Sequence, residues 1–290
     1  MMEFFLNEIK KIENSKQVSF TARYPFLLPL VLESKRVVRT LSYNLGPQYK
    51  TEINSNTHTW FHITNHSSPL YRKYNKKELD DGKITNIEIA NTFLNDIVIP
   101  PGKIFSLWRH VGRISSRRGF RNGLVLSNGY LKSDIGGGLC QLSNLIGYMF
   151  ACSECAFTER KHHSRDVFPD SNRTIPFASG ATIFFNLIDL KIKNTYHYPL
   201  KLNLRTTNTQ LRGSISIPVQ LRYYVKLEEK NSFFFKSQKT NKVYRCNTLH
   251  RIFYDKKTKN KIKEQILWRN VAEVMYPEHN IKQHIVLIKT

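Results

Sequence analysis

The residues best suited to chemistry are a cysteine and the three glycines before it, in the run Gly136-Gly137-Gly138-Leu139-Cys140. Glycine lacks a Cβ atom and tolerates positive φ, so this run predicts a tight turn whose backbone N–H groups can approach a ligand. The apolar spacing that follows predicts a helix. Cys140 would lie at the positive end of that helix, where unpaired N–H groups favour a thiolate. We therefore expect a nucleophilic cysteine with a lowered pKa.

A nucleophilic cysteine needs a base, a group that orients the base, and donors for the oxyanion. His163 is the expected base, because it follows the predicted helix closely enough for the chain to return past Cys140. Gln141, beside the thiol, is the expected side-chain donor. The candidates to orient the imidazole are Asp166, Asp170 and Asp189. This set would attack a carbonyl and transfer an acyl group.

The expected substrate-binding residues surround the same motif and are Gly136, Gly137, Gly138, His162 and Ser164. A packing or phosphate-binding turn is the other interpretation of the glycines. A P-loop is not indicated, because no Lys-Ser or Lys-Thr pair follows them. A cysteine and a pair of histidines also occur together by chance, so a non-catalytic interpretation stays open.

No metal site and no cofactor is expected. Cys152 and Cys155 form a C-x-x-C pair, but a zinc site needs two further ligands at comparable spacing. His162 and His163 are adjacent, and adjacent side chains of a strand point to opposite faces. The chain has 4 cysteines, too few for a disulfide scaffold, which favours reduced thiols.

The elements that would position these residues indicate an α+β fold, with mixed and antiparallel strands around a buried helix that starts at the Gly-Gly-Gly-Leu-Cys-Gln turn. Helical spacing predicts helices over 83–97 and 140–151, and residues 1–45 read as helical. Asn128-Gly129 predicts a hairpin. Strands are expected between 155 and 227, most clearly at 182–188, 190–192 and 200–204.

Three segments are expected along the chain. Residues 1–56 form an N-terminal helical extension, 57–227 form the main domain, and 228–290 form a basic, aromatic extension with a weak core of its own. We see no internal repeat.

The charge restricts the partners. Lys and Arg number 45 against 22 Asp and Glu, a net charge of +23 that attracts anionic surfaces such as membrane lipids or wall polymers. The basic residues are scattered in short pairs, so nucleic-acid binding is not favoured. No apolar run is long enough to span a membrane, and the N-terminus lacks the pattern of a secretory leader. A cytoplasmic protein, with peripheral membrane contact as an open alternative, is expected.

Several motifs together resemble the VanW family. They are Pro100-Pro101-Gly102 through Trp108, Arg118-Gly119-Phe120, Gly136 through Asn144, His162-His163-Ser164, Pro169-Asp170-Ser171, Pro176 through Ile183 and Asp189-Leu190. The resemblance runs from about residue 60 to about residue 245. It implies a role in glycopeptide resistance and cell-wall metabolism. Exported relatives are described as L,D-transpeptidases, which implies Cys140 as the acyl-forming nucleophile and His163 as its partner. Those relatives have aspartate where this chain has Gly180.

Two hypotheses of function follow, and a third depends on charge alone. The first is a Cys-dependent acyl transferase that acts on a peptidoglycan peptide stem or precursor. The second is a non-catalytic module that binds cell-wall precursors, anionic lipid carriers or resistance enzymes. The third, nucleic-acid binding, is supported only by net charge. The sequence does not predict the oligomeric state.

Overall fold

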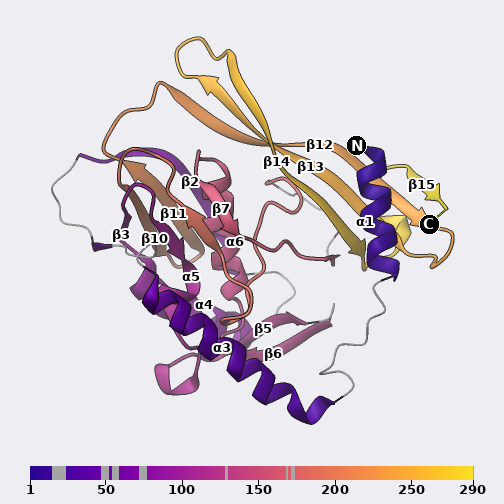
Figure 1. Cartoon of the computed structure of the whole chain (residues 1–290), viewed down its shortest axis with the longest axis horizontal. Coiled ribbons are helices and arrows are strands. Elements are labelled where there is room, and N and C mark those ends of the chain that lie inside the picture. The colour runs from indigo at the N-terminus through magenta and orange to yellow at the C-terminus, as the bar shows by residue number, and fades with distance from the viewer. Residues whose placement is uncertain are drawn as a thin grey trace.

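The computed structural model describes residues 1–14, 24–46, 52–53, 59–71, 77–127, 130–167, 169–170 and 174–289. Its helices and strands form an α+β fold, as expected, with two large sheets and several helices (Figure 1). The helices are α1 (Met2–Asn14), α3 (Leu28–Leu45), α4 (Lys77–Leu94), α5 (Leu107–Val111) and α6 (Leu139–Ala151). Short 3₁₀ turns lie at Pro25–Leu27, Ser116–Arg118 and Glu278–Asn280.

The first sheet is antiparallel and has the strand order β1-β3-β10-β11-β2. Its strands are β1 (Glu52–Ile53), β2 (Phe61–Pro69), β3 (Ile97–Ile99), β10 (Leu200–Thr206) and β11 (Gln210–Ile217). β10 alternates between buried and less buried residues, with Leu200, Leu202 and Leu204 in the core. One face of the sheet is therefore apolar and must be covered.

Helices α4 and α6 cover that face and form the main core with it. The buried residues of α6, such as Leu142, Leu145 and Met149, follow helical spacing. At Gly213 of β11 an added Cβ would lie 2.6 Å from Met149 Cε and 2.7 Å from Leu145 Cδ2. A larger residue there would require the ends of these two side chains to move, so glycine allows the close approach of helix and strand.

Smaller sheets surround the start of α6. β5 (Asn122–Ser127) and β6 (Tyr130–Ile135) pair as the expected hairpin, whose turn at 128–129 lies outside the described residues. β4 (Ile104–Ser106), β9 (Lys191–Lys193) and β7 (Ala156–Glu159) form a second small antiparallel sheet. These two sheets complete the frame around the helix.

The second large sheet comes mainly from the C-terminal part of the chain and has the order β15-β12-β13-β14-β8. Its strands are β8 (Arg165–Asp166), β12 (Tyr223–Ser237), β13 (Val243–Asp255), β14 (Lys261–Val274) and β15 (Ile285–Ile288). The central strand β13 is buried from Val243 through Phe253. This segment is a well-packed sheet, and its apolar clusters include residues from α1 and from the end of α6. The expectation of a weak core of its own stays a prediction.

Arg251 of β13 joins this sheet to α6. Its guanidinium donates to the carbonyl oxygens of Ala151 (3.0 Å) and Cys155 (3.1 Å) at the end of the helix. A cation at a helix C-terminus pairs with carbonyls that have no partner inside the helix. β12 also runs without a break through residue 227, where we expected the main domain to end. The boundary expected at residue 56 lies outside the described residues, and the three-segment division stays a prediction.

Two local expectations differ from the structure. The amphipathic helix expected at 83–97 begins earlier, at Lys77, and ends at Leu94. Residues 182–188, expected as a strand, contain only isolated bridges, Lys161 with Thr182 and Phe184 with Ile188. Their alternating apolar residues instead line an irregular segment, because Ala181 and Ile183 turn toward the core over α6.

Helix α1 packs on the second large sheet, most of whose strands are distant from it in the sequence (Figure 1). Phe5 and Ile9 of α1 join a cluster with Phe235, Tyr244 and Val271. Phe5 is fully buried, whereas its neighbour Phe4 is 39% exposed. The N-terminal helix is therefore an integral part of the C-terminal half of the fold.

This packing gives the first test. Phe5→Ala should lower the free energy of unfolding by roughly 3 to 5 kcal/mol, because it removes a fully buried aromatic ring and leaves a cavity. Phe4→Ala is the matched control and should cost less than about 1 kcal/mol. Urea unfolding followed by circular dichroism measures both. Equal effects of the two substitutions would contradict the docking of α1.

Candidate functional site

Cys140 lies in the first turn of α6, as expected, and is partly buried against the core. The segment Gly180–Ile183 covers the start of the helix. Ser143 Oγ donates to Ala181 O (2.6 Å), and Asn144 Oδ1 accepts from Ala181 N (2.8 Å). The thiol itself has a hydrogen bond with the backbone of Ile183. The sulfur therefore faces the irregular segment Gly180–Ile183.

This environment makes the expectation of an acidic thiol wrong. Burial raises the pKa of the Cys140 thiol, although the hydrogen bond with the Ile183 backbone favours the thiolate. Removing a charged group from water disfavours the charged form, and here that cost exceeds the benefit of the hydrogen bond. At neutral pH Cys140 is a protonated thiol.

The glycine turn has the predicted conformation, with φ of 78° at Gly136 and 92° at Gly138. Its N–H groups are already occupied: Gly136 donates to Arg121 O, Gly137 to Asp134 O and Gly138 to Leu124 O, at 2.9 to 3.1 Å. The turn thus binds the β5–β6 hairpin with the donors that were expected to face a substrate.

Steric contacts explain why this turn requires glycine. A Cβ on Gly137 would lie 2.1 Å from the backbone carbonyl of Gly123, and one on Gly138 would lie 2.1 Å from Lys83 Cγ. The buried side chain of Asn86 also reaches the turn and donates to Gly137 O (2.9 Å). The glycines therefore allow close packing of α4, β5 and α6.

Gln141 points away from the thiol toward the end of β2. Its Nε2 donates to Ser68 Oγ and Pro69 O, both at 2.7 Å. The amide that was expected to stabilise an oxyanion thus holds strand β2 to the start of α6.

His162, His163 and Ser164 lie beside the C-terminal sheet. His162 Nε2 is hydrogen-bonded to Val271 O (3.0 Å), and Ser164 O accepts from Glu273 N (3.0 Å). Burial, together with the nearby His162 and Arg160, lowers the pKa of His163 to about 4. Within the described ranges of the chain, no hydrogen bond joins His163 to Cys140. The proposed nucleophile and base are therefore not hydrogen-bonded to each other in this part of the structure, and the pairing stays a prediction.

Asp170 and Asp166 form ion pairs with a buried arginine. Arg245 is buried, and its guanidinium lies 2.7 Å from Asp170 and 3.4 Å from Asp166. A third carboxylate, that of Glu229, lies 3.6 Å away. These acids compensate a buried cation that would otherwise be costly.

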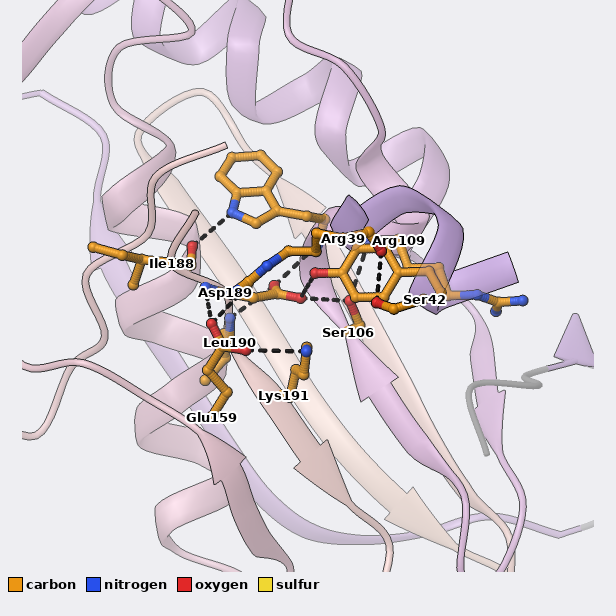
Figure 2. A network of polar contacts seen from close by, with 11 residues as sticks. Arg39, Ser42, Ser106, Arg109, Glu159, Ile188, Asp189, Leu190 and Lys191 are labelled. Carbon is orange, nitrogen blue, oxygen red and sulfur yellow. Dashed lines mark hydrogen bonds and ion pairs between the residues drawn. The ribbon is translucent and has the colours of Figure 1, made fainter. Parts of the chain in front are cut away.

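Asp189 is fully buried in a network with α3 and the start of α5 (Figure 2). Its Oδ2 accepts from Tyr43 OH (2.7 Å) and Ser106 Oγ (2.5 Å), and its Oδ1 accepts from Trp108 N (3.1 Å). Burial raises the pKa of this carboxyl, while the hydrogen bonds oppose the increase. Its partners are structural, so it does not orient the imidazole of His163 in this arrangement.

Arg160 is a residue that sequence reasoning missed. Its guanidinium donates to Gly180 O (2.9 Å) and to Ala178 O, and it stacks 3.5 Å from the centre of the Trp268 ring. It thereby fixes the segment over Cys140 from the other side. No local sequence pattern indicates this role, because Ala178, Gly180 and Trp268 are all distant from Arg160 in the sequence.

A steric contact explains the glycine at position 180, where the family resemblance implies an aspartate in exported relatives. A Cβ at this position would lie 2.2 Å from Asn144 Oδ1. That oxygen is the acceptor for Ala181 N. An aspartate could not occupy this position without displacing Asn144, so the structure leaves no acid here.

The other cysteines are buried and free. Burial raises the pKa of Cys152 and of Cys155 to about 11. Among the residues that the structure describes, no group of three or more His, Cys, Asp or Glu side chains is arranged to hold a metal ion. The C-x-x-C pair therefore consists of two interior thiols near the end of α6.

Comparison with known proteins places this geometry in a family. The family model for VanW like protein matches residues 82–216, from α4 to β11. The vancomycin B-type resistance protein VanW of Enterococcus faecalis is 25% identical over 264 residues, which cover 89% of this chain and 94% of that protein. Residues 82–216 of the chain are therefore similar to the VanW family. The expected resemblance is confirmed.

A second relative of the VanW domain is more distant. The uncharacterized protein YoaR of Bacillus subtilis is 23% identical over 120 residues, which cover 41% of this chain and 38% of that protein. No solved structure matches this chain. Helices α1 and α3 and strands β12 to β15 lie outside the residues matched by the family model. Most of the residues in these elements fall within the length shared with the Enterococcus protein, because that match covers 89% of this chain.

The raised pKa of Cys140 in this VanW domain gives a test of reactivity. Alkylation of the native protein by iodoacetamide should increase with pH through pH 9 without a plateau below pH 8, because the reactive thiolate is scarce until the raised pKa is approached. The Cys140→Ser variant is the control, because it lacks this thiol and shows which part of the alkylation occurs at Cys140. Mass spectrometry of the Cys140 peptide follows the rate, and a plateau near pH 7 would show an acidic thiol.

Proposed function

We propose that the protein is an accessory protein of glycopeptide (vancomycin) resistance that acts in cell-wall metabolism by binding peptidoglycan peptide stems or their precursors. The observation that carries this proposal is the similarity to the vancomycin B-type resistance protein VanW, which extends over 94% of that protein. A match of such length includes the elements outside the VanW domain, and not only the motifs around Cys140.

The site geometry favours binding over catalysis. His163 and Gln141 were the expected base and oxyanion donor, and Asp170 and Asp189 were the expected groups to orient the imidazole. In the described structure Gln141 donates to Pro69 O, Asp170 pairs with Arg245 and Asp189 accepts from Tyr43. The glycine N–H groups are occupied within the fold. The net charge of +23 provides attraction for anionic precursors or lipid carriers.

A binding role predicts independence from the thiol. Wild type and Cys140→Ala should bind a soluble muramyl pentapeptide with equal Kd in isothermal titration calorimetry, and the affinity should fall as salt is raised because the attraction is partly electrostatic. In a host that carries the resistance genes, both should restore the same vancomycin tolerance to a strain lacking this gene. No binding at low salt would contradict the proposal.

Acyl transfer by Cys140 is the second candidate. It is supported by the position of Cys140 at the start of a helix and by its partial exposure, since the other three cysteines are buried. The thiol would lose its proton to a base and form a thioester with the peptide carbonyl as the leaving amine takes up a proton. An acceptor amine would then attack the thioester and release the thiol. His163 would have to approach Cys140 for this step.

The two candidates differ in one measurement. Incubation with a peptide stem and an amine acceptor should yield no thioester on Cys140 and no exchanged peptide if the protein only binds. Intact-mass spectrometry detects the adduct, and the Cys140→Ala variant gives the background. An adduct present in wild type and absent from the variant would establish the transferase and replace the binding proposal.

A further inference from the structure

Helix α3 docks on the VanW domain through its polar side. Arg39 forms an ion pair with Glu159 (2.7 Å), Tyr43 donates to Asp189, and Thr40 Oγ1 accepts from Asn186 Nδ2 (2.8 Å). Figure 2 shows Arg39 of this helix beside Glu159 and Asp189. An amphipathic helix on a globular protein usually buries its apolar side. Here the polar side is the one that faces the protein.

The opposite side of α3 is apolar and exposed. Its large apolar side chains, with their exposed fractions, are Leu30 (69%), Val37 (52%), Val38 (67%), Leu41 (53%) and Leu45 (81%), and Phe26 (77%) precedes the helix. At 3.6 residues per turn the five helical positions fall within about 100° of one another around the axis. In Figure 1 the helix runs along the outside of the molecule. We name these six residues the α3 apolar face.

The charged residues of α3 are mainly cationic. The helix carries Lys35, Arg36 and Arg39 against the single acid Glu33, and Arg39 is paired with Glu159 on the docked side. Glu33 is already paired, with Arg36 at 3.1 Å and with Arg113 at 3.0 Å. An apolar stripe flanked by Lys and Arg is the pattern of a helix that lies in the surface of an anionic bilayer.

Helix α3 is too polar to cross a bilayer. Its four charged residues are spread along the middle of its length. Among the described residues, no helix is long and apolar enough to cross a bilayer. With its polar side bound to the VanW domain, α3 can insert only its apolar side.

We propose that the α3 apolar face docks the protein on an anionic lipid bilayer, with the helix parallel to the surface and Phe26, Leu30, Val38 and Leu41 among the acyl chains. The docked polar side then places the VanW domain at a fixed orientation above the headgroups. The proposal is independent of whether Cys140 is catalytic and of which peptide the protein binds.

Substitutions that keep the charge test the proposal. The double variant Val38→Gln, Leu41→Gln should bind phosphatidylglycerol vesicles at least about tenfold more weakly than wild type in co-sedimentation, because each substitution removes buried apolar area without changing the net charge. The matched control is Ile262→Gln, Leu287→Gln, two residues of the C-terminal sheet that are 59% and 63% exposed. This control should bind as wild type does.

The remaining outcomes are also decisive. Phosphatidylcholine vesicles should bind less wild-type protein than phosphatidylglycerol vesicles do, because the flanking cations contribute. Equal vesicle binding by wild type and the α3 double variant would show adsorption by net charge alone and would overturn the proposal. A wild-type dimer that the α3 substitutions dissociate, seen by sedimentation velocity without vesicle binding, would also overturn it and assign the face to a second copy. Circular dichroism confirms that both variants fold.

Discussion

Both ends of helix α6 need partners for backbone groups that the helix itself leaves unpaired, and the fold is arranged around that requirement. At the N-terminal end, the glycine turn hydrogen-bonds to the β5–β6 hairpin and to Asn86 of α4. At the C-terminal end, Arg251 of β13 binds the last carbonyls. Because these partners come from both halves of the chain, the helix links the VanW domain to the C-terminal sheet.

The same requirement determines the state of Cys140. The N–H groups of the glycine turn, which were expected to stabilise a thiolate or an oxyanion, donate to backbone carbonyls of the fold. The side chains of Ser143 and Asn144 hold the segment Gly180–Ile183 over the helix start. A backbone group that satisfies the fold is not available to a substrate. The thiol is consequently a buried, protonated group in this arrangement, and binding is the function that the geometry supports better than acyl transfer.

Asp189 has a comparable role for the N-terminal part of the chain. A buried carboxylate must be satisfied by donors, and Tyr43 and Ser106 provide them from α3 and from the start of α5. This polar contact fixes the polar side of α3 against the domain and leaves its apolar side facing outward. Asp189, which was expected to orient a catalytic imidazole, therefore anchors the helix that we propose to dock on a lipid surface.

The sequence by itself determined the α+β class, the buried helix that follows the three glycines, the hairpin at Asn128-Gly129 and the family, because each depends on local spacing or on motifs in fixed order. It did not determine the partners of Cys140, His163, Asp170 and Asp189. Those of Cys140, Asp170 and Asp189 come from residues far along the chain, namely Ile183, Arg245 and Tyr43. Local spacing limits which residue types can meet. Only tertiary packing decides which polar groups are already satisfied and how deeply each is removed from water.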